Sequence, residues 1–423
     1  MELNNLERKL FEEIEEIEII DAHEHLPPEE ERLKLKVDIF TLFSHYTHYD
    51  LLNAGMKGEE YKSLFNHDIP LEKRWKTFSP FWEKIRYTSY SKAVILAVKK
   101  FYGVSEINEK TYKLISERIK EKNKKGIYEN VLRKACNIKT CLTQCGRTDL
   151  KSDLLKPVMP LVYGMEKKED LINPPFEKNK NISIKTLNDY LESLKRYILR
   201  IKKEGVVGLK MVCLPYGKPD RKKAESIFKK IISGYEIFEP KWPDFPDSNP
   251  LKDYVVDFAI KFAGEQNLVI AVHTGYWGDF RKLNPTHMIP ILQRHPEVKF
   301  DIYHCGYPYM REALMLGKGF PNVYLNFCWV HIISQKFAQI ALDEVIDLIP
   351  VNKIIAFGGD YSIPVEKVYG HLVMAKEDVV KVFARRIKET HLKKEEAINI
   401  IKRWFFENPS ILYNLKRSEN EKN

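Results

Sequence analysis

The feature that most constrains the fold is a series of short apolar, β-branched runs that recurs along the whole chain. Most runs are followed by a polar turn and then by a helical pattern. Their apolar character is nearly continuous, which favours parallel strands buried on both faces over an alternating antiparallel sheet. The eight runs cover residues 17–22, 137–143, 157–163, 206–212, 268–272, 298–303, 323–327 and 353–357.

Helical patterns separate the later runs, so strands and helices are expected to alternate. These patterns cover residues 182–203, 222–233, 254–265, 286–294, 309–317 and 335–348. Eight strands alternating with helices are typical of a (β/α)8 TIM barrel, so we predict this α/β fold. A chain of 423 residues is long enough for such a barrel with large insertions.

Two parts of the chain exceed a minimal barrel. Residues 34–135 separate the first two strands and contain helical patterns at 90–102 and 109–122, so we predict a helical cap over the barrel mouth. After the eighth strand, 365–388 and 394–406 are expected to form extra C-terminal helices. The predicted domains are therefore a barrel of residues 1–33 and 136–415, the cap, and a flexible tail of 416–423.

Charge and composition argue against several classes of partner. The net charge is +10, but 30% of the residues are charged and both signs are interleaved, with no nucleic-acid-binding motif. No apolar run reaches the ~18 residues of a membrane span, and the acidic, amphipathic start is no signal peptide. Six cysteines without a CxxC pair are expected to be structural thiols of a reducing compartment. We therefore expect a cytoplasmic protein that binds neither nucleic acid nor membrane.

The strongest local motif is the DAHEH sequence directly after the first apolar run. Residues two apart on a strand point to the same side, so His23 and His25 can both face the barrel interior. Active sites of such barrels lie at the C-terminal ends of the strands. Two imidazoles at such a place can share one metal ion, although hydrogen-bonded core histidines give the same pattern.

Further residues able to bind metal follow three other predicted strands. His273 ends the fifth strand, His304 ends the sixth, and Asp360 follows the eighth in the sequence FGGDY. Four of the chain's 12 histidines thus occupy strand ends at one mouth of the barrel. This convergence predicts a metal site.

With these motifs the chain resembles the amidohydrolase superfamily of metal-dependent barrels. The resemblance runs from DAHEHL through VHTG, YHCG, PNVYLNFCW and FGGDY to the closing ENPSILY, which is similar to the amidohydrolase-related branch. That branch includes hydrolases, hydratases and decarboxylases. Within the insertion, Trp82, residues 93–104, the sequence NEKT and residues 127–141 are similar to uronate isomerases, barrel enzymes that hydrolyse nothing.

The resemblance implies roles for individual residues. His23, His25 and His273 would be imidazole ligands, and Asp360 a carboxylate ligand that also shuttles a proton. His304 would be either a catalytic acid/base or a ligand to a second ion. The ion would be divalent, with zinc our first choice and manganese, iron or nickel as alternatives.

Substrate contacts are predicted from residues near the mouth. Arg86 in the cap would meet a substrate carboxylate, with a plain surface arginine as the alternative. Lys210 on the fourth strand would meet a substrate carboxylate or a barrel carboxylate, with a bridging carboxylated lysine as the alternative. Tyr276 and Trp329 would wall the pocket. His45 and His48, in an aromatic loop, are expected to have packing or surface roles. Barrels of this kind often pair, so a homo-oligomer is compatible with the sequence.

Two reaction classes fit this pattern. Our first hypothesis is a hydrolase that uses a metal-activated water on a small polar or anionic, carboxylated substrate. The alternative is a non-hydrolytic relative, either a uronate isomerase or a metal-dependent decarboxylase. The same fold and metal site serve all three reactions, so the sequence alone does not separate them.

Overall fold

The computed structural model describes residues 3–144, 152–178, 182–238, 240, 244–245, 247–389 and 392–415. The predicted flexible tail, residues 416–423, and Cys145 lie outside this described part. The other five cysteines are buried, free thiols. No helix among the described residues combines the length and apolar character needed to cross a bilayer.

The described residues form one sheet of eight strands in the order β1 to β8, and each register that the structure defines is parallel. With helices between the strands, this is the predicted TIM-barrel fold. The strands are β1 (Ile19–Glu24), β2 (Ile138–Thr143), β3 (Leu155–Pro160), β4 (Gly208–Val212), β5 (Val269–His273), β6 (Phe300–Ile302), β7 (Val323–Asn326) and β8 (Ile354–Ile355).

The chain divides into two compact units. Unit 1 comprises residues 1–143, 328–343 and 356–406, and unit 2 comprises residues 144–327, 344–355 and 407–423. Strands β1 and β2 belong to unit 1, and β3 to β8 to unit 2. The predicted division into barrel and cap remains a prediction.

Unit 1 contains the helical segment between β1 and β2. Its core is rich in aromatic side chains, among them Phe40, Phe43, Trp75, Phe78 and Trp82. The helices are α1 (Asn5–Glu15), α2 (Glu29–Leu33), α3 (Thr47–Asn53), α4 (Gly58–Ser63), α5 (Leu71–Ile85), α6 (Ser89–Tyr102), α7 (Tyr112–Lys122), α14 (Val330–Ile333), α16 (Glu366–Lys388) and α17 (Lys394–Lys402). A π-helical turn, η2 (Glu129–Ala135), leads into β2.

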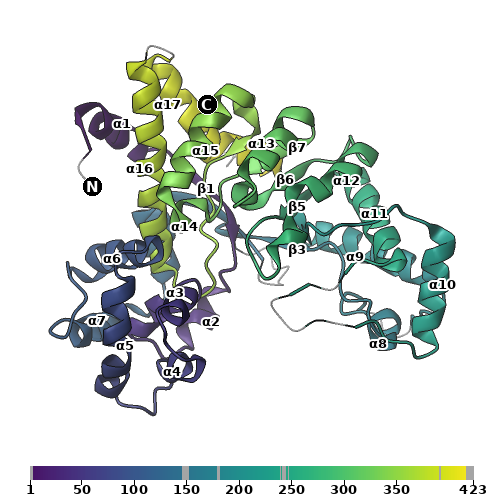
Figure 1. Cartoon of the computed structure of the whole chain (residues 1–423), viewed down its shortest axis with the longest axis horizontal. Coiled ribbons are helices and arrows are strands. Elements are labelled where there is room, and N and C mark those ends of the chain that lie inside the picture. Colours follow the sequence, from purple (N-terminus) through teal and green to yellow (C-terminus); the bar gives the residue numbers. More distant parts are fainter. Residues whose placement is uncertain are drawn as a thin grey trace. The chain divides into compact units, whose positions relative to one another are not determined.

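The long helix α16 connects the parts of unit 1. It is the yellow-green helix of Figure 1, and it packs against α1, α6, α14 and α17. Its contact with α6 is close because Gly370 lies directly against the backbone of Ala93. The C-terminal helices predicted after the eighth strand are thus confirmed.

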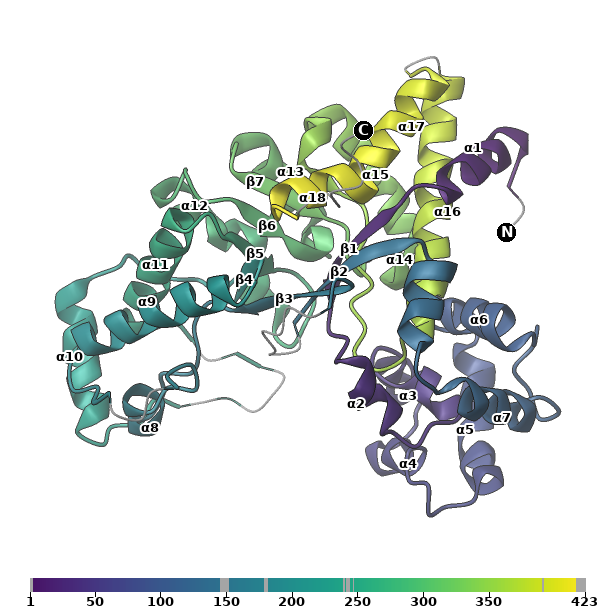
Figure 2. The same ribbon diagram turned by 180° about the vertical axis from the view of Figure 1, so that it is seen from behind.

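Unit 2 places its helices around strands that are almost fully buried. Figure 2 shows α9 and α11 side by side, with α10 beside them. The described helices of this unit are α8 (Lys168–Ile172), α9 (Leu187–Lys203), α10 (Arg221–Ile232), α11 (Pro250–Glu265), α12 (Ile289–Arg294), α13 (Met310–Gly319) and α18 (Asn408–Leu412). Helix α15 (Gln335–Leu348) follows α14 along the chain.

Candidate metal centre

Hydrogen bonds between β1 and the segment after β8 bring the first motif and Asp360 together. The Asp360 N–H donates to the His23 carbonyl at 2.8 Å, and the His25 N–H donates to the Tyr361 carbonyl at 3.0 Å. Asp360 adopts a left-handed backbone with φ of 61°. Such a conformation is strained for a residue other than glycine, so the surrounding bonds must hold it.

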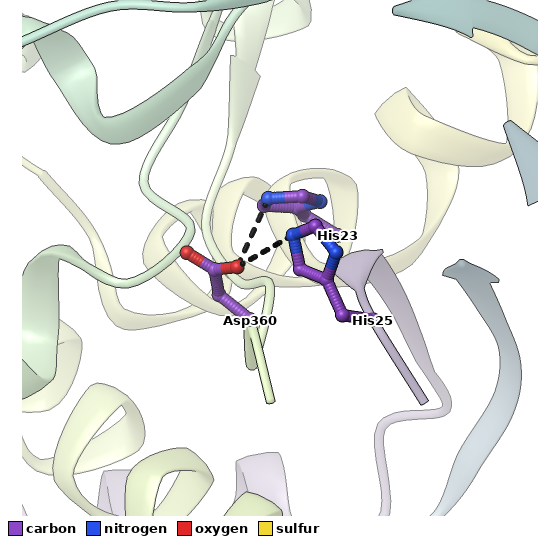
Figure 3. A group of neighbouring side chains, drawn as sticks. All are labelled: His23, His25 and Asp360. Atoms are coloured by element: carbon purple, nitrogen blue, oxygen red, sulfur yellow. Dashed lines mark ion pairs between the residues drawn. The ribbon is translucent and has the colours of Figure 1, made fainter. Parts of the chain in front are cut away.

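The side chains of His23, His25 and Asp360 converge on one point. The Nε2 atoms of His23 and His25 lie 3.1 and 3.3 Å from the same oxygen, Oδ1 of Asp360, as Figure 3 shows. One ligand atom from each residue lies within 4.8 Å of the others. His23 and Asp360 are buried, whereas the His25 side chain is 35% exposed.

These distances fit a shared metal ion. Two ligand atoms that are each about 2.1 Å from an ion, with an angle of about 90–110° between them, are about 3.0–3.4 Å apart. Two imidazole nitrogens and one carboxylate oxygen also form a donor set that suits zinc, iron, manganese or nickel. The three residues therefore fit the divalent ion that the sequence predicts, and they leave its identity open.

Two buried carboxyl groups on β1 hold the backbone on either side of Asp360. Oδ1 of Asp21 accepts a hydrogen bond from the Gly359 N–H at 3.0 Å, and Oε2 of Glu24 accepts one from the Tyr361 N–H at 2.6 Å. Burial raises the pKa of Asp21 to about 7 and the pKa of Glu24 well above its usual value. The nearby Asp21 carboxyl group raises the Glu24 pKa further, which favours a proton on Glu24.

The helical insertion contributes His45 and Tyr46 to this site. Burial, together with the nearby Asp360 carboxylate, raises the pKa of the Tyr46 phenol well above 10. Burial lowers the pKa of His45 to about 4, although Asp360 opposes this shift. At neutral pH the site therefore contains a protonated phenol and a neutral imidazole beside Asp360.

Sequence reasoning did not find this pair. It gave His45 and His48 packing or surface roles, and both do pack, since His45 contacts the ring of Tyr361 and His48 contacts that of Tyr61. The proximity of His45 and Tyr46 to Asp360 joins residues more than 300 positions apart. No local pattern signals such a contact.

An aromatic cluster adjoins Tyr46. Its ring stacks on Tyr90 with centroids 5.3 Å apart and lies 6.1 Å from the Trp329 ring. The Trp329 indole N–H donates to the Tyr90 hydroxyl at 3.1 Å, and Trp329 is only 4% exposed. Trp329, predicted to wall the pocket, thus lies near the site, and its contact with substrate remains a prediction.

In unit 2, the structure pairs His273, the last residue of β5, with His304, which lies in the 3-10 turn after β6. His304 Nε2 lies 3.0 Å from His273 Nδ1, and both residues are buried. When His273 donates from Nδ1 to His304 Nε2, its own Nε2 carries a lone pair that can bind a metal ion. Metal-binding histidines are commonly oriented by such a hydrogen bond from the other ring nitrogen. The predicted roles of His273 as a ligand and of His304 as an acid/base remain predictions.

Lys210 lies in a buried polar cluster of unit 2. Its ammonium is 3.7 Å from the centroid of the Tyr303 ring and lowers the pKa of Asp301. Burial outweighs this effect and raises that pKa to about 7. Asp301 also accepts hydrogen bonds from Asn326 and Tyr413. These contacts agree with the alternative in which Lys210 meets a barrel carboxylate, while its contact with substrate stays a prediction.

Two further predicted substrate residues are at the surface of their units. Arg86 ends α5, and its guanidinium lies 3.2 Å from the Glu83 carboxylate. Tyr276, which follows β5, is 41% exposed and contacts the ring of Phe280. Neither observation tests a role in substrate binding.

Comparisons with known proteins find a family match over part of this chain. Residues 188–372 match the sequence profile of the family described as amidohydrolase. Protein fluG of Emericella nidulans is 27% identical over 198 residues, a match that covers 44% of this chain and 22% of that protein. The matched segment therefore spans about a fifth of the length of this relative.

Several solved structures match nearly the whole chain, two uronate isomerases among them. A uronate isomerase from Thermotoga maritima has a TM-score of 0.78 and 15% identity, covering 97% of this chain and 98% of its own. A glucuronate isomerase from Caulobacter crescentus has a TM-score of 0.77 and 16% identity, covering 98% and 95%. At this identity the likeness shows a common fold. This chain is therefore similar to the amidohydrolase family over residues 188–372, and its fold is similar to that of two uronate isomerases.

Proposed function

We propose that this protein is a metal-dependent isomerase of a sugar acid, converting an aldose form of a uronate into the corresponding ketose. The observation that carries the proposal is the convergence of His23, His25 and Asp360, with the Tyr46 phenol close enough to the Asp360 carboxylate for that carboxylate to raise its pKa. It provides a protonated acid and a carboxylate base at one place. The full-length likeness to two uronate isomerases, helical insertion included, supports the same reaction.

Interconversion of an aldose and a ketose moves a proton between neighbouring carbons. A base must remove the proton from C2 and return it to C1, while the carbonyl oxygen at C1 gains a proton and the hydroxyl at C2 loses one. The Asp360 carboxylate can act as the base, and the Tyr46 hydroxyl, which is protonated at neutral pH, can act as the acid. A divalent ion at His23, His25 and Asp360 would polarise the carbonyl.

Hydrolysis with a metal-activated water, our first hypothesis from the sequence, is the second candidate. It is supported by the match of residues 188–372 to a family described as amidohydrolase. The same Asp360 would then accept a proton from water rather than from carbon. Zinc as the ion and a carboxylated substrate remain part of the proposal under either reaction. Arg86 and Lys210 are the proposed partners of the carboxylate.

Product mass separates these reactions. The purified, metal-loaded protein is incubated with glucuronate and galacturonate, with lactones and with carboxylated phenols. Isomerisation leaves the mass unchanged and forms a ketose, hydrolysis adds one water, and decarboxylation removes carbon dioxide. Conversion of a uronate at constant mass is the expected result. Turnover of a lactone, with no change in either uronate, would overturn the proposal in favour of hydrolysis.

A further inference from the structure

A buried lysine on α16 contacts the insertion next to the candidate site. Lys367 is 0% exposed, and its amine lies 3.2 Å from the Thr47 hydroxyl and 3.4 Å from the Ser44 carbonyl. The amine also lies 5.1 Å from the centroid of the Tyr361 ring. Lys367 thus contacts both sides of the segment 44–47 and the residue that follows Asp360.

The segment 44–47 is the part of the insertion that brings His45 and Tyr46 to the site. His45 has a positive φ of 66°, and the turn is closed by the His48 N–H, which donates to the His45 carbonyl at 3.1 Å. A non-glycine residue in this conformation is strained, so the fold around it must hold it there. The two groups bound by Lys367 flank His45 and Tyr46 directly.

The burial of this amine is unfavourable by itself. A buried cation loses its hydration, and this loss is unfavourable unless an opposite charge compensates for it. Burial lowers the Lys367 pKa to about 7, although Asp50 raises it. A neutral amine still has two N–H groups, so it can donate to both oxygens in either charge state. An apolar side chain would fill the same space but would make neither hydrogen bond. This points to a role for the polar atom rather than for packing.

We propose that Lys367 is a positioning residue that holds the segment 44–47 so that Tyr46 reaches Asp360. The role of Tyr46 in turnover rests on the proposed function. The positioning of the segment 44–47 by Lys367 does not depend on the proposed function, because its contacts are present in the unliganded chain. Lys367 itself touches neither metal ligand side chains nor substrate in this scheme.

The first test measures the segment without any reaction. Amide hydrogen exchange of peptides covering residues 44–48 is compared in wild type, Lys367→Met and Thr47→Val. The control is Lys376→Met, since Lys376 is a second buried lysine of α16 whose amine faces the Glu15 carbonyl. We expect about tenfold faster exchange in Lys367→Met, a smaller increase in Thr47→Val and no change at 44–48 in the control.

The second test asks whether Lys367 acts through Tyr46. Turnover is measured for Lys367→Met, Tyr46→Phe and the double variant. We expect Lys367→Met to lower kcat by about 10- to 100-fold, and to add little in the Tyr46→Phe background. The dissociation constant for zinc is expected to stay within threefold of wild type. Effects that multiply in the double variant would show that Lys367 acts independently of Tyr46 and would overturn the proposal.

The two tests fail separately. Unchanged exchange at 44–48 in Lys367→Met overturns the positioning role whatever the protein catalyses. Faster exchange in a protein that does not convert uronates supports the positioning role and contradicts the proposed isomerase activity. The double-variant comparison is then made with whichever reaction the product-mass assay identifies. Should Lys367→Met fail to fold, Thr47→Val decides the matter, since valine keeps the shape and removes one acceptor of the amine.

Discussion

Gly359 offers a sharp test of how Asp360 is positioned. A Cβ atom at this position would lie 1.9 Å from Oε1 of Glu24 and 3.3 Å from Oδ2 of Asp21. Real Cβ contacts are essentially never below 3.0 Å, so Gly359→Ala must displace the Glu24 carboxyl group or the 359–361 backbone by about 1 Å. Either movement stretches the hydrogen bonds that Glu24 and Asp21 accept from this backbone.

The size of the effect follows from these bonds. Each buried N–H left without a partner costs about 1–3 kcal/mol, so losing one or both lowers the free energy of unfolding by about 1–6 kcal/mol. A shift of about 1 Å in Asp360 also spoils its alignment with His23 and His25. Changes in residues that orient metal ligands weaken metal affinity by about 10- to 100-fold, and we expect this range for Gly359→Ala.

Urea unfolding of the metal-free protein gives the first quantity, and competition with a chelator for zinc gives the second. Gly58→Ala is the matched control, because a Cβ there has no neighbour within 4 Å and the residue begins helix α4. Alanine should leave stability equal or slightly higher at that position and metal affinity unchanged. If Gly359→Ala unfolds and binds zinc as wild type does, the carboxyl groups of β1 do not position Asp360.

Three further changes have defined outcomes. His23→Ala removes one of three converging donors, so bound metal and turnover should both be lost, as elemental analysis and activity would show; full turnover by the metal-free variant would contradict the metal site. Gly370→Ala would place a Cβ 2.1 Å from the carbonyl oxygen of Ala93, so we expect a loss of about 1–3 kcal/mol in urea unfolding, and an unchanged midpoint would refute the close approach of α16 and α6. The Lys367 pKa is about 7 in the folded chain and near 10.5 when unfolded, so between these values the unfolded chain binds more protons and this residue makes stability rise with pH. In chelator-treated protein, Lys367→Met should remove up to about 1.4 kcal/mol per pH unit of that rise, and equal slopes for both proteins between pH 7 and 10 would count against a buried amine.

The fold could be predicted because its strands are buried on both faces, which leaves continuous apolar runs in the sequence. The first and last residues of helices and strands were less predictable where individual hydrogen bonds determine them. Helix α9 begins at Leu187 rather than at residue 182, because Thr186 and Asp189 form a capping box. Strand β8 covers only Ile354–Ile355 of the predicted run 353–357, since Ala356 donates to the Trp404 carbonyl and the Phe357 carbonyl accepts from Ala22.

The candidate site was predictable only where strand ends supply it. His23, His25 and Asp360 follow from the rule that parallel strands end at one mouth, because that rule needs only the positions of the strands. Tyr46 does not follow from it, since its place depends on how the insertion packs on α16. The likeness of that insertion to uronate isomerases indicated the proposed reaction only as the alternative to hydrolysis, and no sequence pattern pointed to Tyr46.

The protonation states around Asp360 bear on the kind of substrate that the site favours. Tyr46 and Glu24 keep their protons and His45 is neutral at pH 7, because burial raises the first two pKa values and lowers the third. A divalent ion held by two imidazoles and the Asp360 carboxylate would carry one uncompensated positive charge, which the Asp21 carboxyl group, with a pKa of about 7, would offset only in part. Buried charge attracts a counter-charge strongly, so an anionic sugar acid, or the negative charge that develops on its oxygens during isomerisation, is stabilised there. A neutral substrate would gain less from this environment, which is a physical reason to test uronates before uncharged sugars.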